Sequence, residues 1–146
     1  MLPTLRTLLE PDARHEGVRR IRIHLLRTLY ALMFFMLGST SWTEVLTHRG
    51  AWEPYEAVAW SIWAAFATLA GLGILHPLKM LPILLLEIFY KVLWLIMVAY
   101  PLWSTNTLAG SPAEGIASVF WPVIVVVAIV PWAYVLKHYA SWKGAA

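Results

Sequence analysis

The chain has 146 residues, of which 60% are hydrophobic and 13% are charged, whereas soluble domains are nearer half apolar and a quarter charged. This composition indicates an integral membrane protein. The sequence contains no cysteine, which excludes disulfides, thiolate metal sites and cysteine nucleophiles, and its formal charge of +3 is concentrated at one end, which argues against nucleic acid as a partner.

Residues 1–23 form a predicted basic N-terminal segment on the cytoplasmic side. The segment precedes a full-length apolar stretch and carries no small-residue cleavage pattern, so it does not have the pattern of a cleavable signal peptide. The stretch Leu2–Leu9 is compatible with a short amphipathic turn on the membrane surface and equally with a loosely ordered tail. The basic residues of the segment are Arg6, Arg14, Arg19, Arg20 and Arg22.

Residues 24–136 are predicted to hold four transmembrane helices, each close to the ~20 residues that cross the hydrocarbon of a bilayer. The predicted spans are His24–Trp42, Ala57–Leu75, Leu81–Tyr100 and Ile116–Leu136. The predicted fold class is therefore an all-α membrane protein, a four-transmembrane-helix bundle. Residues 137–146 are predicted to form a short cytoplasmic C-terminal tail.

Proline positions give the expected ends and bends of these helices. Pro101 is predicted to end the third span. Pro122 and Pro131 lie inside the fourth span, where each removes a backbone donor. A broken helix of the kind that transporters use is one interpretation, but proline is common in membrane spans, so a static kink is the prediction.

The distribution of Lys and Arg predicts the orientation. Lys79 lies in the turn between spans two and three, and Lys137 and Lys143 follow span four, while only Arg49 lies on the opposite side. By the positive-inside rule both termini face the cytoplasm, and the expected location is a bacterial inner membrane. The placement of Trp agrees, because interfacial indoles cluster toward the outer boundary at Trp42, Trp52, Trp60, Trp103 and Trp121, and Trp142 lies past the inner one.

Two opposite charges lie inside the third predicted span. Glu87 and Lys91 are four residues apart with the acid first, which is the favourable order for a helical ion pair. Because charge inside a bilayer is costly, this face must point at protein or water, and it is a candidate ligand or proton pocket. A buried network that only fixes helix register explains the same residues. The expected pocket adds Arg27, Tyr30, Tyr90 and Trp94, with Arg27 or Tyr30 contacting Glu87 from span one.

Small residues on the second span predict the surface that packs against the other helices. In lipid, small faces allow close helix approach. The predicted inward arc consists of Ser61, Ala64, Ala65, Thr68 and Gly71.

Two weaker patterns raise the question of a metal. His24, His76 and His138 are expected near the cytoplasmic boundary, where a metal or a haem is conceivable, although basic residues and histidines are ordinary at that boundary. On the outer side Glu44 and His48 stand at i and i+4 and are followed by two more acids, which suits a divalent cation. A short amphipathic connector accounts for the same outer residues.

The functional expectation is a non-catalytic protein, because no catalytic or nucleotide-binding motif is present. The first hypothesis is an accessory or scaffold subunit of a membrane complex, whose partners are the lipid bilayer and either other membrane subunits or further copies of itself. The second is a redox-linked, quinone-like small-molecule or proton-handling protein that uses the Glu87/Lys91 pocket. The third is an oligomeric channel or small transporter. The sequence leaves the cofactor, if there is one, unidentified.

Overall fold

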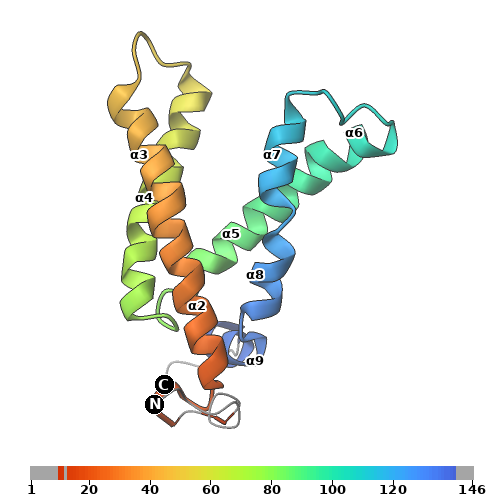
Figure 1. Cartoon of the computed structure of the whole chain (residues 1–146). Coiled ribbons are helices and arrows are strands. Elements are labelled where there is room, and N and C mark those ends of the chain that lie inside the picture. Colours follow the sequence, from red (N-terminus) through yellow and green to blue (C-terminus); the bar gives the residue numbers. More distant parts are fainter. Residues whose placement is uncertain (1–9, 12, 141–146) are drawn as a thin grey trace. The chain divides into compact units, whose positions relative to one another are not determined.

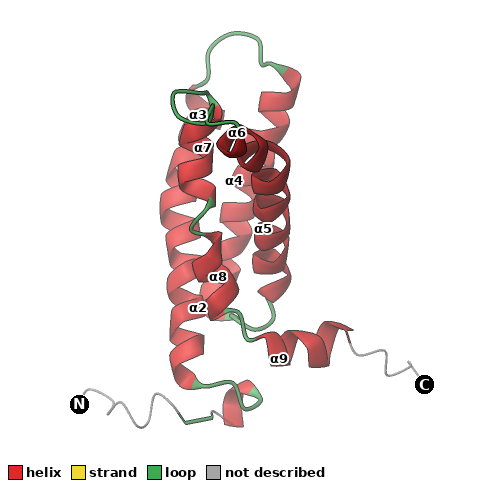
Figure 2. Cartoon of the chain, turned by 90° about the vertical axis from the view of Figure 1, so that its right-hand side faces the viewer, coloured by secondary structure: helices red, strands yellow, loops and turns green. Residues whose placement is uncertain are grey.

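The computed structural model describes residues 10, 11 and 13–140, and the described chain is built from helices joined by loops, without a β-strand (Figure 2). The expected turn at Leu2–Leu9 and the predicted boundary residues Arg6, Trp142 and Lys143 lie outside the described residues. The chain divides into two units, one formed by residues 1–81 with 131–146 and the other by residues 82–130.

A helical hairpin forms most of the first unit. Its first arm runs from Arg20 to Thr47 and contains helix α2, a π-helical turn η2 and helix α3; its second arm is helix α4, which lies alongside the first arm (Figure 1). Glu53 caps α4 by accepting a 2.7 Å hydrogen bond from the Glu56 amide, and a proline occupies the first turn. The bounds are Arg20–Leu32 for α2, Met33–Leu37 for η2, Gly38–Thr47 for α3 and Pro54–Leu75 for α4.

Small residues let the two arms approach closely. Ala64, Ala67, Ala70 and Gly73 are buried on α4, and the buried ring of Tyr30 lies so near Gly73 that a Cβ there would overlap it. Along the same contact Gly38 faces Ala67 and Gly71 faces Phe34.

The predicted inward arc of the second span is only partly correct. Ala64 is buried, but Ser61, Ala65 and Thr68 are exposed. The buried face is rotated by about one residue relative to the prediction, because the rings of the first arm require space opposite glycines rather than opposite the hydroxyl residues. Thr68 instead lies at the edge of the contact, where its hydroxyl accepts a 3.0 Å hydrogen bond from the indole nitrogen of Trp42.

The first unit also contains two segments from opposite ends of the chain. A 3-10 turn, η1 (Ala13–His15), is followed by two residues with left-handed backbone, Glu16 (φ 53°) and Gly17 (φ 81°), before α2 begins. Helix α9 (Trp132–Val135) and the π-helical turn η4 (Leu136–Ala140) belong to the same unit. The Tyr139 hydroxyl donates a 3.3 Å hydrogen bond to the Leu78 carbonyl oxygen, which fixes η4 against the turn after α4.

The second unit is built from the remaining helices. Helix α5 begins at the unit boundary and continues through the π-helical turn η3 into α6; after a loop, α7 packs against η3 and is followed by α8. In the loop, the Gly110 amide, on a left-handed residue, donates a 2.7 Å hydrogen bond to the Glu114 carboxylate in the first turn of α7. The bounds are Leu81–Trp94 for α5, Leu95–Ala99 for η3, Tyr100–Ser104 for α6, Ala113–Phe120 for α7 and Val123–Ile129 for α8.

Within the described residues three helices are long and apolar enough to cross a membrane: Arg20–Thr47, Pro54–Leu75 and Leu81–Ser104. The number becomes four if the pieces on either side of Pro131 count as one broken span. All three helices are longer than predicted: the first extends at both ends, the second begins at Pro54 and the third continues to Ser104. Pro101 does not end the third helix, because the preceding π-turn, in which the Tyr100 amide bonds the Leu95 carbonyl, accommodates the proline within a continuing helix.

The fourth predicted span is not one kinked helix, and that prediction is wrong. The segment divides at Trp121–Pro122 and again at Val130–Pro131. Val130 leaves the helical region with ψ 128°, and Pro131 follows with ψ 81°. A proline disfavours helical backbone in the residue before it and has no amide to continue the hydrogen-bond ladder, so the second break is complete rather than a bend.

Candidate functional site

The two charges of the third long helix form an ion pair inside the second unit. Lys91 Nζ lies 2.6 Å from Glu87 Oε1, and the side chains of Lys91 and Glu87 are only 14% and 8% exposed. Helical geometry produces this pair directly, since residues i and i+4 project from the same face. Leu84, Trp94 and Val98 continue the face, and of these Leu84 is fully buried.

An aromatic cluster covers the ammonium side of this pair. The ring of Phe120, from α7, lies 5.5 Å from Lys91 Nζ, within the range of a cation–π interaction. The same ring meets Tyr90 and Trp94 edge to face, at centroid distances of 5.6 and 5.2 Å. Sequence reasoning named Tyr90, Lys91 and Trp94 but missed Phe120, whose only local signal is an aromatic side chain next to the Trp121–Pro122 break.

The second oxygen of Glu87 is the chemically open position of this site. Glu87 is buried, and its Oε2 atom has no hydrogen-bond partner among the described residues, while Oε1 is bound by Lys91. A buried carboxylate oxygen without a donor is costly, so its lone pairs are available to a proton, a polar ligand or a donor from another molecule.

The residues that were expected to reach Glu87 from span one lie in the other unit. Tyr30 is fully buried there, and its hydroxyl donates a 3.1 Å hydrogen bond to the Pro77 carbonyl oxygen. Arg27 is half-buried, and its Nε atom lacks a hydrogen-bond partner among the described residues. The pairing of Glu87 with Arg27 or Tyr30 spans the two units and stays a prediction.

The candidate metal ligands are not gathered into a metal centre. Over the described chain no three His, Asp or Glu side chains come close enough to hold an ion. His138 lies against Glu16 and not with His24 and His76. In the loop after α3, His48 Nδ1 lies 3.4 Å from Glu44 Oε1, and the His48 ring stacks on the Trp52 ring with centroids 3.5 Å apart. These contacts are those of a connecting segment stabilised by aromatic packing.

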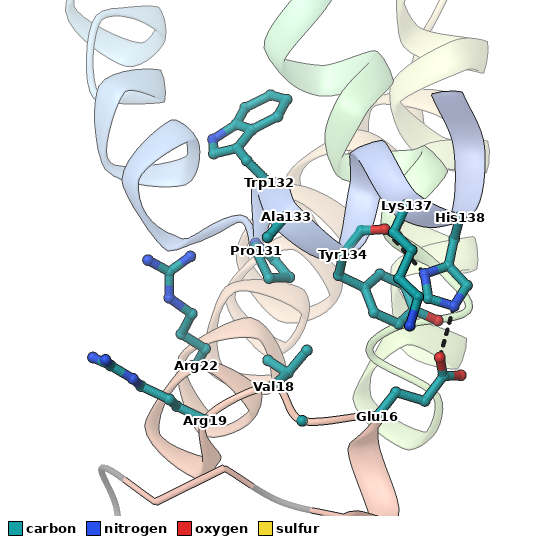
Figure 3. Close-up of a pocket in the computed structure, with 11 residues that line it drawn as sticks. Glu16, Val18, Arg19, Arg22, Pro131, Trp132, Ala133, Tyr134, Lys137 and His138 are labelled. Carbon is teal, nitrogen blue, oxygen red and sulfur yellow. Dashed lines mark hydrogen bonds and ion pairs between the residues drawn. The ribbon is translucent and has the colours of Figure 1, made fainter. Parts of the chain in front are cut away.

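A cleft of about 490 Å³ opens in the first unit between the N-terminal loop and the last helical segment. Figure 3 shows Arg19 and Arg22 side by side on one flank of Val18 and Pro131, with Glu16, Lys137 and His138 on the other flank. The sequence places the arginines, Lys137 and His138 near the cytoplasmic boundary but does not predict a cleft, because the two walls are far apart in the chain. The full lining is Glu16, Gly17, Val18, Arg19, Arg22, Pro131, Trp132, Ala133, Tyr134, Lys137 and His138.

The carboxylate in this cleft is already engaged. His138 Nε2 lies 2.6 Å from Glu16 Oε2, and His138 Nδ1 lies 3.1 Å from the Tyr134 carbonyl oxygen (Figure 3). The Tyr134 ring stacks on the His138 ring with centroids 4.0 Å apart. Both ring nitrogens of His138 therefore lie next to oxygen atoms, one of the Glu16 carboxylate and one of the Tyr134 carbonyl group. The left-handed backbone of Glu16 aims its side chain at this partner.

Comparison with protein-family models, with curated protein sequences and with solved structures finds no match to this chain.

Proposed function

We propose that this chain is an integral protein of a bacterial inner membrane that crosses the bilayer four times, with both termini in the cytoplasm, and acts as a non-catalytic accessory or scaffold subunit. In this proposal the helices of the two units close into a bundle and pack against other membrane helices. The long apolar helices support membrane embedding. The proposed orientation is supported by the concentration of Lys and Arg at the ends assigned to the cytoplasm.

The single observation that carries the scaffold function is how much apolar surface of the long helices is left uncovered by the unit to which each helix belongs. Between 22% and 28% of the most apolar window of each helix is buried. Large apolar side chains are exposed along the helices of both units, among them Phe35, Met36, Phe89, Ile96 and Met97. Lipid, the other unit or a helix of a neighbouring protein must cover this surface, and the part that the closing of the two units leaves uncovered is available to an assembly.

Native mass measurement of the protein extracted in mild detergent tests this proposal. The expected result is a species heavier than the 16.5 kDa chain by the mass of a partner subunit or of another copy. A photo-crosslinking residue at Phe89, on an exposed apolar face, should capture that neighbour. The same group at Tyr55, next to the loop that precedes α4, is the control and should not. A lone chain without crosslinks under every extraction condition contradicts a scaffold role.

The orientation has its own test, because a chain without native cysteine accepts single reporter thiols. Asn106→Cys lies in the loop proposed to face outward, and Lys79→Cys lies in the turn proposed to face the cytoplasm. A membrane-impermeant maleimide should label position 106 in intact cells and position 79 only after lysis. The reverse pattern would contradict the proposed topology while leaving the scaffold proposal standing.

A second function is favoured by the open oxygen of Glu87. A buried carboxylate with one oxygen on Lys91 and the other without a donor is suited to accepting a proton or to binding a small polar group such as a quinone head group. For this function Glu87→Gln should abolish retention of a bound small molecule in the native mass spectrum while the protein elutes as wild type. If no small molecule is retained by the wild type, or if the variant retains it equally, Glu87 serves only to fix the helix.

A further inference from the structure

We propose that a groove at the α6–α7 end of the second unit binds an organic ammonium group, and that the headgroup of a zwitterionic phospholipid supplies it. The groove has a volume of about 440 Å³, and its described lining lies wholly within residues 82–130 (Figure 1). The proposal rests on the membrane embedding proposed for the chain only in naming a lipid as the source. The described lining consists of Leu95, Ala99, Tyr100, Trp103, Leu108, Glu114, Ala117, Ser118 and Trp121.

Three aromatic side chains line the groove with accessible rings. Tyr100 and Trp103 belong to α6, and Trp121 directly follows α7. Their exposed fractions are 62%, 66% and 62%. The ring centroids of Tyr100 and Trp103 are 6.3 Å apart and the ring planes are inclined at 37°, so neither ring covers the face of the other. The face of an aromatic ring attracts a cation that lies within about 6 Å of its centroid, and the attraction is strongest for Trp.

The charged side chain of the described lining is a carboxylate. Glu114 is exposed in the first turn of α7, and its Oε2 atom accepts a 2.7 Å hydrogen bond from the Gly110 amide, which holds the side chain in place. Lys91 is the single basic residue of positions 82–130, and it is paired with Glu87, so no cation of this unit neutralises Glu114. The groove therefore combines aromatic rings with a negative charge, which favours a cation over an anion.

The rest of the lining favours an organic cation over a metal ion. Ala99 and Ala117 are buried, Leu95 and Leu108 are half-buried, and all four present apolar surface to the groove. Ca²⁺ takes about six to eight oxygen ligands, whereas the carboxylate is accompanied in this lining mainly by carbon atoms. The methyl and methylene groups next to an ammonium nitrogen fit such a surface, because their burial is favourable.

The place of the groove in the chain indicates a phospholipid. Tyr100 and Trp103 lie at the end of the 24-residue apolar helix Leu81–Ser104, which is the level of the lipid headgroups when that helix crosses a bilayer. Zwitterionic phospholipids carry their ammonium group at this level. An aromatic belt at the membrane boundary explains the rings alone but requires no carboxylate among them. The charge of the ligand is therefore the property that distinguishes a binding site from a belt.

Fluorine NMR of the full chain in neutral detergent, with fluorotryptophan in place of tryptophan, tests this charge preference. The probes are choline and its neutral analogue, in which a carbon atom replaces the nitrogen. Choline should shift the resonances of Trp103 and Trp121, which are assigned by single replacement with phenylalanine, and the neutral analogue should not. This measurement does not depend on the scaffold role or on the orientation of the chain in the membrane.

Glu114→Gln is the decisive variant, because it removes the charge but keeps an acceptor oxygen for the Gly110 amide. It should weaken choline binding about two- to fivefold. Glu56→Gln makes the same change in the first turn of α4 and is the matched control that should bind as wild type. Equal shifts with choline and its neutral analogue, no shift with choline, or equal affinities of the two variants would overturn the proposal.

Native mass spectrometry with phosphatidylethanolamine and phosphatidylglycerol identifies the source of the ammonium group. Wild-type protein should retain phosphatidylethanolamine more strongly, and Glu114→Gln should reduce that preference. If choline binds as expected but the two lipids are retained equally, the lipid assignment is wrong and the ligand is a soluble ammonium compound. Should Glu114→Gln not elute as wild type, Trp121→Leu should show the same two- to fivefold loss of choline affinity, about that of one cation–π contact, and Trp42→Leu, outside the groove, should not.

Discussion

The hydroxyl of Tyr30 donates a 3.1 Å hydrogen bond to the carbonyl oxygen of Pro77, which fastens the first arm of the hairpin to the turn after the second arm. Both residues are buried, and the ring of Tyr30 fills the space that Gly73 leaves empty. One side chain thereby sets both the spacing of the two helices and the height at which they meet, since the ring requires the glycine and the hydroxyl requires the carbonyl.

Gly73→Ala should destabilise the hairpin by about 1–3 kcal/mol, because the new methyl group would overlap the ring of Tyr30 and push the helices apart. Thermal unfolding of the detergent-solubilised protein, followed by circular dichroism, measures the effect. Gly115→Ala is the matched control: it adds a methyl group to a helix where nothing lies within 4 Å, so stability should stay the same or rise slightly. A similar loss in both variants would show that the close approach at Gly73 is unimportant.

Tyr30→Phe should cost about 1 kcal/mol, because it keeps the ring against Gly73 but leaves the buried Pro77 carbonyl without its donor. Amide hydrogen exchange should show faster opening in the turn that follows α4, and the rest of the hairpin should be unchanged. Tyr55→Phe removes a hydroxyl from a residue that is 85% exposed and should alter neither measurement. If the amides of this turn exchange at the wild-type rate in the Tyr30→Phe variant, the role assigned to this hydrogen bond is refuted.

Lys91→Met should destabilise the protein by roughly 3–5 kcal/mol, since it leaves the Glu87 carboxylate buried without its opposite charge. Adding Glu87→Gln to Lys91→Met should recover most of that loss. A double-mutant cycle on unfolding free energies measures the coupling between the two side chains. Lys79→Met, at an exposed lysine, should change stability by no more than about 0.5 kcal/mol. If the losses in unfolding free energy of the two single variants add up to the loss of the double variant, the two side chains are not coupled.

Phe120→Leu should cost about 1–2 kcal/mol, because the smaller side chain gives up the edge-to-face contacts with Tyr90 and Trp94 and the cation–π contact with Lys91. The emission of Trp94, isolated by replacing the other tryptophans with phenylalanine, should change at the same time. Phe89→Leu, on the outward face of the same unit, is the control and should leave that emission unchanged. An unchanged Trp94 spectrum in Phe120→Leu would contradict the cluster.

The features that the sequence predicts correctly are those with a local cause. Helix α4 ends at Leu75 and α5 starts at Leu81, as expected, because Pro77 and Pro82 restrict the backbone between them. The Glu87–Lys91 pair forms because two residues four apart in a helix share a face whatever surrounds them. The apolar stretches themselves are long enough to identify the helices that are able to cross a membrane.

The features that escape prediction depend on partners that are remote in the sequence. Phe120 joins the third-span cluster only through the packing of α7 on η3, which periodicity within either helix does not reveal. The inward face of α4 is set by the rings opposite it, and a pattern of small residues alone leaves its rotation uncertain by about one position. The sequence does not decide between a kink and a break at Val130–Pro131, because one proline is compatible with both a kinked and an interrupted helix.

The first unit is discontinuous, and this has a consequence for how the protein is made. Its last elements, α9 and η4, leave the ribosome after the whole of the second unit has been synthesised, yet they supply His138 to Glu16 and Tyr139 to Leu78. The segment around Glu16 therefore acquires these contacts only after the second unit, which lies between the two parts in sequence, has been synthesised. A nascent chain arrested before Pro131 would hold the hairpin without its closing segment, so the order of synthesis and the order of assembly differ in this protein.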